Sequence, residues 1–161
     1  MFRLDKFFSC LIIMLNTVDQ KLNSMCCLGC HNSNNCGTIN IYGKNFDKLL
    51  RRDDTLRHLI KMFNDAITIS ETYFNSNKFV VDADLSGVTF NNIDTDFLKQ
   101  LTLILQATYP ERLDKCFIRN PPAIFTSVWD LIKGLIDKRT RDKVEIIKNN
   151  KVIQLQEKIL F

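Results

Sequence analysis

The sequence predicts an α/β fold in which crossover helices join the strands of a mostly parallel β-sheet. Short apolar runs alternate with longer segments of helical period, and the connections between runs exceed twenty residues, which is enough for helical crossovers. The 161 residues are 45% apolar and 25% charged, with five glycines and three prolines. Such a composition is typical of one globular domain and excludes collagen-like, low-complexity and wholly disordered chains.

Residues 1–36 are predicted to form an N-terminal helix and a Cys/Asn-rich loop. The helix is predicted from apolar side chains at helical spacing, which are Leu4, Phe7, Phe8, Leu11, Leu15, Val18 and Leu22. Residues 23–38 lack an apolar period and predict the loop. Five of the six cysteines precede residue 37, whereas a disulfide framework would spread its pairs over distant segments. We therefore expect reduced thiols and a cytoplasmic protein.

Residues 37–161 are predicted to hold the α/β elements in order. Four strands are expected, at residues 38–42, 78–82, 115–119 and 144–147. The second strand is the most uniformly apolar, which is typical of a central position. Helices are expected at residues 46–50 and 56–74, between Asp94 and Pro110, and at residues 124–136 and 152–160. Asp94 is a plausible N-cap, and Pro121-Pro122 presets the start of the helix that follows.

The predicted helix at residues 124–136 has an unusually wide apolar side. Its apolar residues fill an arc of roughly 160°, wider than the ~100° stripe of an ordinary surface helix. They are Ile124, Phe125, Val128, Trp129, Leu131, Ile132, Leu135 and Ile136. Such a face is typical of deep packing against a sheet, of a lid over an apolar ligand, or of a helix that enters a membrane.

Four motifs in a fixed order resemble the CRAL-TRIO lipid-binding domain of the Sec14-like phospholipid transfer proteins. The first is the strand and turn Phe79-Val80-Val81-Asp82-Ala83-Asp84-Leu85-Ser86-Gly87, and the second is Tyr109-Pro110-Glu111-Arg112-Leu113. The third is Asn120-Pro121-Pro122 followed by Phe125, Trp129 and Lys133. The fourth is Asp137-Lys138-Arg139-Thr140-Arg141-Asp142-Lys143-Val144. Together with a weaker match at residues 39–67, the resemblance covers about two-thirds of the chain.

This resemblance implies that one hydrophobic lipid is enclosed between a sheet floor and a helical gate at residues 124–136. The expected gate and cavity residues are Phe125, Val128, Trp129, Ile132, Leu135, Ile136, Phe79 and Val81. In family members that bind phosphoinositides, a Glu of the second motif and the Lys of the fourth hold the headgroup. These positions are Glu111 and Lys143 here, with Arg112 beside them. We expect the bound lipid to be the ligand and expect no metal or other cofactor.

The chain departs from the family pattern at several points. Members that bind phosphatidylcholine carry hydroxyl residues where Phe79 and Val81 stand, so that headgroup is disfavoured. Gly134 replaces the usual proline of the gate and loosens the helix by about 1 kcal/mol. The resemblance also implies a domain shortened at both ends: residues 1–36 replace the usual helical N-terminal domain, and the domain at 37–161 lacks the closing segment. A protein partner could complete it.

Two alternatives rest on other residues. Cys27, Cys30 and His31 match a haem-attachment pattern, and with Cys36 they could ligate zinc. Asp82 and Asp84, two residues apart beyond a buried strand, could hold Mg²⁺ in a phosphotransferase or phosphatase. A structural interpretation of the same motif is that Asp84 braces the turn. The chain could also be a vestigial protein-interaction domain.

The positive charge lies near the expected headgroup residues. Net charge is +4, and the whole excess follows residue 110, where 11 basic residues stand against 7 acidic ones. This distribution suits the anionic face of a cytoplasmic membrane and is too weak to predict nucleic-acid binding. We therefore predict a non-enzymatic protein that binds a phospholipid such as a phosphoinositide, and transfers or presents it during transient contact with a membrane.

Overall fold

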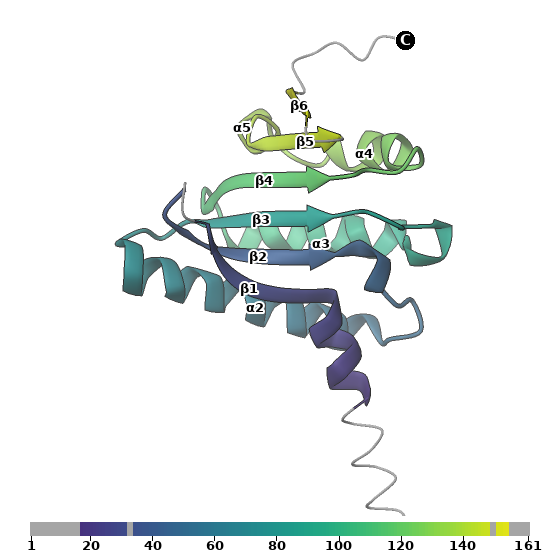
Figure 1. The fold of residues 1–161 in the computed structure, drawn as a ribbon, viewed down its shortest axis with the longest axis horizontal. Coiled ribbons are helices and arrows are strands. Elements are labelled where there is room, and N and C mark those ends of the chain that lie inside the picture. Colours follow the sequence, from purple (N-terminus) through teal and green to yellow (C-terminus); the bar gives the residue numbers. More distant parts are fainter. Residues whose placement is uncertain (1–16, 32–33, 149–150, 155–161) are drawn as a thin grey trace, which may run out of the picture.

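Six strands form a single sheet in the order β1-β2-β3-β4-β5-β6 (Figure 1). The computed structural model describes residues 17–31, 34–148 and 151–154. The strands are β1 (Cys26–His31), β2 (Cys36–Tyr42), β3 (Phe79–Asp84), β4 (Leu113–Arg119), β5 (Val144–Lys148) and β6 (Lys151–Gln154). β2 to β5 are parallel, and β1 and β6 pair antiparallel at the two edges. The predicted α/β fold with a mostly parallel sheet is confirmed.

The helices connect successive parallel strands. They are α2 (Arg52–Phe74), α3 (Thr95–Thr108), α4 (Phe125–Lys133) and the four-residue α5 (Lys138–Arg141). Two 3₁₀ turns, η1 (Gly43–Asn45) and η2 (Phe90–Asn92), follow β2 and β3, and residues 17–25 are helical before β1. No helix in the described ranges is long and apolar enough to cross a membrane.

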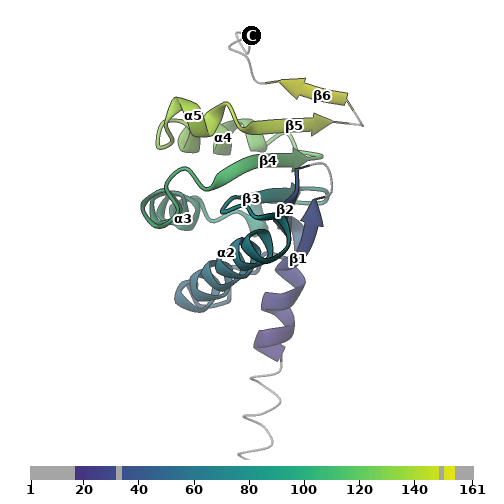
Figure 2. The same ribbon diagram turned by 90° about the vertical axis from the view of Figure 1, so that its left-hand side faces the viewer.

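All these crossover helices cover the same face of the sheet. When parallel strands follow one another in sequence order, crossovers of uniform hand place every helix on one side, and Figure 2 shows this arrangement. The register agrees with it, because Ile39, Val81, Cys116 and Val144 lie side by side across β2 to β5. These four side chains belong to, or pack against, the two apolar cores under the helices.

The larger core joins α2 and α3 to β2 and β3. Leu59, Phe63 and Ile67 are one helical turn apart on α2, so they share the buried face. They meet Ile39 of β2, which is fully buried, and Phe97 of α3. The predicted N-cap of α3 is confirmed, because the Asp94 carboxylate accepts a hydrogen bond from the Phe97 N–H at 3.1 Å.

The opposite face of the sheet is more polar. Asp82 on β3 accepts two hydrogen bonds of 2.7 Å from the guanidinium of Arg119 on β4. Lys115 on β4 pairs with Glu145 on β5. Since side chains alternate along a strand, these residues point away from the helices.

Some predicted elements are wrong at the ends of the chain. Residues 26–31 form β1 rather than a loop, and Cys26 is buried against the core, where cysteine behaves as a small apolar residue. Residues 152–154 belong to β6 rather than to a helix, whereas residues 155–160 of that predicted helix lie outside the described residues. Of the predicted N-terminal helix, residues 17–22 are helical and residues 1–16 lie outside the described residues.

Two internal helices also differ from prediction. Residues 46–50 form turns instead of a helix, and the Asp47 carboxylate accepts a hydrogen bond from the Leu49 N–H at 2.8 Å. Such a side-chain contact offers the backbone an alternative to helix. α4 ends at Lys133 rather than at residue 136, with Gly134 as its C-cap, and α5 was not predicted at all.

Candidate functional site

The predicted headgroup residues Glu111 and Lys143 meet at the edge of the sheet where the parallel strands begin. Glu111 lies in the turn between α3 and β4, with a left-handed φ of 59°. Lys143 directly precedes β5, and its carbonyl accepts a hydrogen bond from the Cys116 N–H at 2.9 Å. The two side chains form an ion pair with 3.9 Å between Oε2 and Nζ. A parallel sheet places both turns at this edge, as the strand order predicted.

Arg139 of α5 joins this pair, although it was not among the predicted site residues. Its guanidinium lies 3.6 Å from Oε1 of Glu111, so the carboxylate stands between two cations. The signal in the sequence was the basic run at residues 138–141. Because that run spans barely one helical turn, its amphipathic pattern was too short to identify a helix.

Arg112 points to a different part of the molecule. Its guanidinium pairs with Glu71 on α2 at 3.8 Å, and no ion pair in the described part of the chain joins it to Glu111. The backbone at Glu111 is left-handed rather than extended, and adjacency to Glu111 in sequence did not place Arg112 in the same cluster.

α5 is positioned by an N-terminal cap. The Asp137 carboxylate accepts hydrogen bonds from the Thr140 N–H at 2.9 Å and from its hydroxyl at 3.1 Å. The Thr140 N–H bond holds the pKa of Asp137 below its ordinary value. The α5 segment thereby presents Arg139 beside Glu111 and Lys143, whereas Lys138 pairs with Asp142 at 2.8 Å and Arg141 donates to the Lys133 carbonyl at 3.2 Å. Guanidinium and ammonium groups in such a cluster are the usual ligands of phosphate oxygens in proteins.

α4 packs its apolar side onto the sheet. Phe125 and Trp129 stack with ring centroids 6.1 Å apart, and both contact the core of Ile118, Val144 and Ile146. Val128 of α4 is buried as well, whereas Leu131 is 46% exposed. Of the other predicted gate residues, Ile132, Leu135 and Ile136 are half-buried, and the last two follow the helix.

The predicted cavity residues of β3 lie in close-packed core in this structure. Phe79 is buried and packs against the rings of Phe63 and Tyr109, with centroids 5.1 Å and 5.9 Å away. Val81 packs against the same cluster. Large apolar side chains therefore fill this space. In this conformation the sheet surface under the helices is therefore packed with protein side chains.

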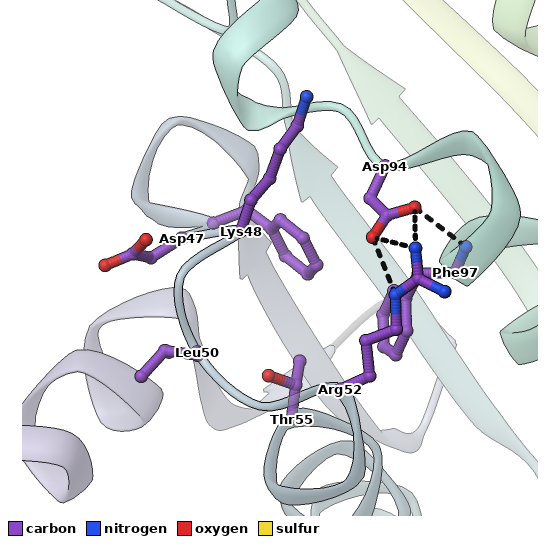
Figure 3. Close-up of a pocket in the computed structure, with 8 residues that line it drawn as sticks. Asp47, Lys48, Leu50, Arg52, Thr55, Asp94 and Phe97 are labelled. Atoms are coloured by element: carbon purple, nitrogen blue, oxygen red, sulfur yellow. Dashed lines mark hydrogen bonds and ion pairs between the residues drawn. The ribbon is translucent and has the colours of Figure 1, made fainter.

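Two hollows in the described part of the chain lie at the opposite edge, where the parallel strands end. One, of about 10 Å³, has room for about one water molecule and is lined by both partners of a bidentate ion pair between Arg52 and Asp94 (Figure 3). The other is an open surface hollow of about 590 Å³ beside residues 44–49. Neither is lined by α4.

The Asp82 and Asp84 pair is engaged in structural contacts. Asp82 is held by Arg119, while Asp84 accepts hydrogen bonds from the Ser86 N–H at 2.9 Å and from the Ser86 hydroxyl. The Ser86 hydroxyl bond lowers the pKa of Asp84. Asp84 therefore braces the turn after β3, as the structural interpretation predicted, and no cluster of three metal-ligating side chains occurs within the described residues.

The alternative metal or haem site at the cysteines falls partly outside the described residues. Cys27 is exposed on β1, with its sulfur 3.7 Å from the Tyr42 hydroxyl, whereas Cys36 is buried on β2. The side chains of Cys30 and His31 lie outside the described part of the chain. The proposed ligand set is therefore not described as a whole.

Residues 21–160 match the family model described as CRAL/TRIO domain. The chain belongs to the CRAL/TRIO domain family. The match contains β1 to β6 and the helices between them, so the domain includes the predicted headgroup pair and α4. The crystal structure of Sfh5 has the same fold, with a TM-score of 0.68 and 23% identity, over 79% of this chain and 50% of that one.

Two curated proteins are similar to this CRAL/TRIO chain in sequence. The Sec14 cytosolic factor of Schizosaccharomyces pombe is 37% identical over 78 residues, which cover 47% of this chain and 27% of that protein. The phosphatidylinositol transfer protein SFH5 of Vanderwaltozyma polyspora is 28% identical over 119 residues, which cover 70% of this chain and 40% of that protein. The matched region thus spans less than half the length of either relative.

Proposed function

We propose that this CRAL/TRIO chain binds one phospholipid of the phosphatidylinositol class and transfers or presents it at a cytoplasmic membrane surface, without catalysing a reaction. The observation that carries the proposal is the meeting of Glu111, Arg139 and Lys143 at the edge where the strands begin. The naming of a relative as a phosphatidylinositol transfer protein supports the same lipid class.

The site has the chemistry for an inositol phosphate headgroup. Lys143 and Arg139 supply an ammonium and a guanidinium for phosphate oxygens, and charge-assisted hydrogen bonds of this kind are roughly twice as strong as neutral ones. Glu111 offers carboxylate oxygens to the ring hydroxyls, which choline lacks. A headgroup that combines phosphate with hydroxyl groups therefore fits this cluster better than a choline headgroup does.

The acyl chains would lie beneath α4, which has to move off the sheet. The N-terminus of α4 has no side-chain cap, because its N-cap is Ile124. By contrast, α3 begins at a capping aspartate. Movement of α4 would replace its contacts with Ile118 and Ile146 by contacts with lipid, so little apolar surface would be left in water.

Native mass spectrometry tests the lipid and its headgroup site together. The protein would be incubated with mixed phosphatidylinositol and phosphatidylcholine vesicles, re-isolated and weighed. We expect a one-to-one phosphatidylinositol complex, and Lys143→Gln should reduce its fraction about tenfold, since hydrogen bonds to charged groups are worth about 1.5–3 kcal/mol. Arg112→Gln is the matched control, because Arg112 pairs with Glu71 instead. Protein that never carries lipid, or equal losses in both variants, would contradict the proposal.

The movement of α4 can be followed separately, because Trp129 is the chain's only tryptophan. Phospholipids with brominated acyl chains quench indole fluorescence only on close contact. We expect quenching of Trp129 on loading with brominated phosphatidylinositol and none with the soluble inositol phosphate headgroup. Loading without quenching would place the acyl chains elsewhere.

A further inference from the structure

We propose that the loops at the edge where the parallel strands end form a docking surface for an anionic lipid bilayer. The surface consists of Lys21, Lys44, Lys48 and Leu49, which line a hollow, and of Phe90, whose carbonyl accepts a hydrogen bond from Lys48. The loops after β2 and β3 lie at the right of Figure 1, where these strands end, whereas Glu111 and Lys143 precede β4 and β5 at the other edge. The inference rests on the proposed function only in that a lipid carrier must reach a membrane.

The charge of this surface favours an anionic partner. The hollow of about 590 Å³ is lined by three lysines and a single carboxylate, that of Asp47. Asp47 pairs with Lys21 at 2.8 Å, and the Lys48 ammonium donates to the Phe90 carbonyl at 2.8 Å. No carboxylate of the described residues is within ion-pair distance of the Lys44 ammonium. The hollow therefore keeps a net positive charge, and both Lys44 and Lys48 retain donors for lipid phosphates.

Two large apolar side chains project beside these lysines. Leu49 is 91% exposed and Phe90 is 76% exposed, and the only comparably exposed large apolar residue of the described ranges is Tyr73, at 74%. Single exposed apolar residues are ordinary on protein surfaces. Two of them flanking a lysine-lined hollow are instead typical of surfaces that insert apolar tips below lipid headgroups while lysines meet the phosphates.

The loops that carry these side chains are held in place by hydrogen bonds. The Asn92 amide donates to the carbonyls of Lys44 at 3.0 Å and of Phe46 at 3.1 Å, which joins the turn after β3 to the turn after β2. The Asn45 amide donates to the Ser24 carbonyl at 2.7 Å, which ties the same turn to the helix at residues 17–25. The apolar tips are thus presented by a braced surface, and docking costs little ordering entropy.

Vesicle co-sedimentation of the 161-residue chain tests this surface. We expect binding to vesicles in which roughly a third of the lipid is phosphatidylserine, weaker binding to pure phosphatidylcholine, and weakening by salt. Lys44→Glu should reduce partitioning at least about fivefold, since each lysine near an anionic surface contributes about that factor. The double variant Leu49→Ser and Phe90→Ser should reduce it at least about tenfold.

Matched controls lie at the other edge. Lys78→Glu changes the net charge as Lys44→Glu does, and Tyr73→Ser removes an apolar side chain of similar exposure; both should bind vesicles nearly as the parent chain does. Equal losses in the controls would overturn the proposal. A second pair of results would also overturn the proposal: the Leu49 and Phe90 double variant binds vesicles as the parent chain does, and a soluble inositol phosphate binds to the lysines. The hollow would then be a site for a free anion rather than for a bilayer.

Loading measured on the same variants separates this proposal from the proposed function. The docking variants should still carry lipid when it is supplied from detergent micelles. Vesicle binding that depends on Leu49 and Phe90 in a chain that never carries lipid would support the docking surface and contradict the proposed function. A chain that carries lipid but binds vesicles independently of these residues would support the proposed function and contradict the docking surface.

Discussion

Gly37 on β2 is the position at which one methyl group should most disturb the fold. A Cβ added there would lie 2.1 Å from the Ala66 carbonyl oxygen and 2.8 Å from its carbon on α2. Both are backbone atoms, so no side-chain rotation can relieve the overlap. The Gly37 N–H also donates to the Ser70 hydroxyl at 2.7 Å, and that hydroxyl donates to the Ala66 carbonyl at 3.1 Å. Glycine is required here for close approach of strand and helix.

The contact distances give the size of the effect. Ordinary contact begins near 3.4 Å, so Gly37→Ala requires α2 and β2 to separate by more than 1 Å. Overpacking of this kind costs about 1–3 kcal/mol, and loss of the hydrogen bond to Ser70 costs about 1 kcal/mol more. We expect the free energy of unfolding to fall by about 3 kcal/mol, a large part of the roughly 5–15 kcal/mol typical of a domain.

Gly134→Ala is the matched control, with the opposite sign. A Cβ at Gly134 meets nothing within 4 Å, and the residue has right-handed helical angles, φ −73° and ψ −17°. Alanine should therefore stabilise the protein by about 0.5–1 kcal/mol. Urea unfolding followed by circular dichroism measures both variants. A Gly37→Ala protein within about 0.5 kcal/mol of the parent would refute the claim that the strand and helix backbones touch here.

Three further predictions concern single side chains. Tyr109→Phe should lower the free energy of unfolding by about 1 kcal/mol in thermal or urea melts, because the hydroxyl donates to Asn64 Oδ1 at 2.8 Å. The pKa of Asp84 is lowered in the folded state, so ionised Asp84 adds to the free energy of unfolding above about pH 4, and this contribution is lost as pH falls through the folded pKa. Between about pH 6 and pH 3 the Asp84→Asn variant should therefore lose less free energy of unfolding than the parent chain does. An equal loss in both proteins would contradict this prediction. Burial raises the pKa of Cys116 to about 12, so iodoacetamide mapping at neutral pH should label the exposed Cys27 and spare Cys116 until urea unfolds the chain.

The interior of the fold was predictable because its signals repeat along each element. α2 keeps one apolar face over 23 residues, and β3 is an apolar run between two parallel neighbours. The edge strands carried weaker signals. β1 is short and half cysteine, and its pairing with β2 depends on Cys26 and Leu28 packing under the helices, which is a tertiary effect. A strand of four residues such as β6 also has too few positions to establish a period.

The candidate site was predictable only in part, for a related reason. Glu111 and Lys143 could be placed together because strand order alone brings their turns to one edge. The orientation of a side chain in a turn depends on local backbone angles, so Arg112 was expected in the cluster and Arg139 was missed. The docking surface left no motif in the sequence, because its residues come from the helix before β1 and from two separate turns.

On the proposed function, the packed state of α4 determines which part of the lipid controls loading. Phe125 and Trp129 already bury apolar surface against Ile118 and Val144. Acyl chains that displace these contacts would exchange one apolar environment for another, so their burial contributes less than the full transfer of a chain from water. The headgroup has no such substitute, because Glu111 is the one carboxylate of the described residues within ion-pair distance of Lys143 and Arg139, at 3.9 Å and 3.6 Å. Selectivity among phospholipids should therefore depend more on the headgroup cluster than on acyl-chain length. Competition between two lipids that differ only in the headgroup, and between two that differ only in acyl-chain length, would measure the two contributions separately.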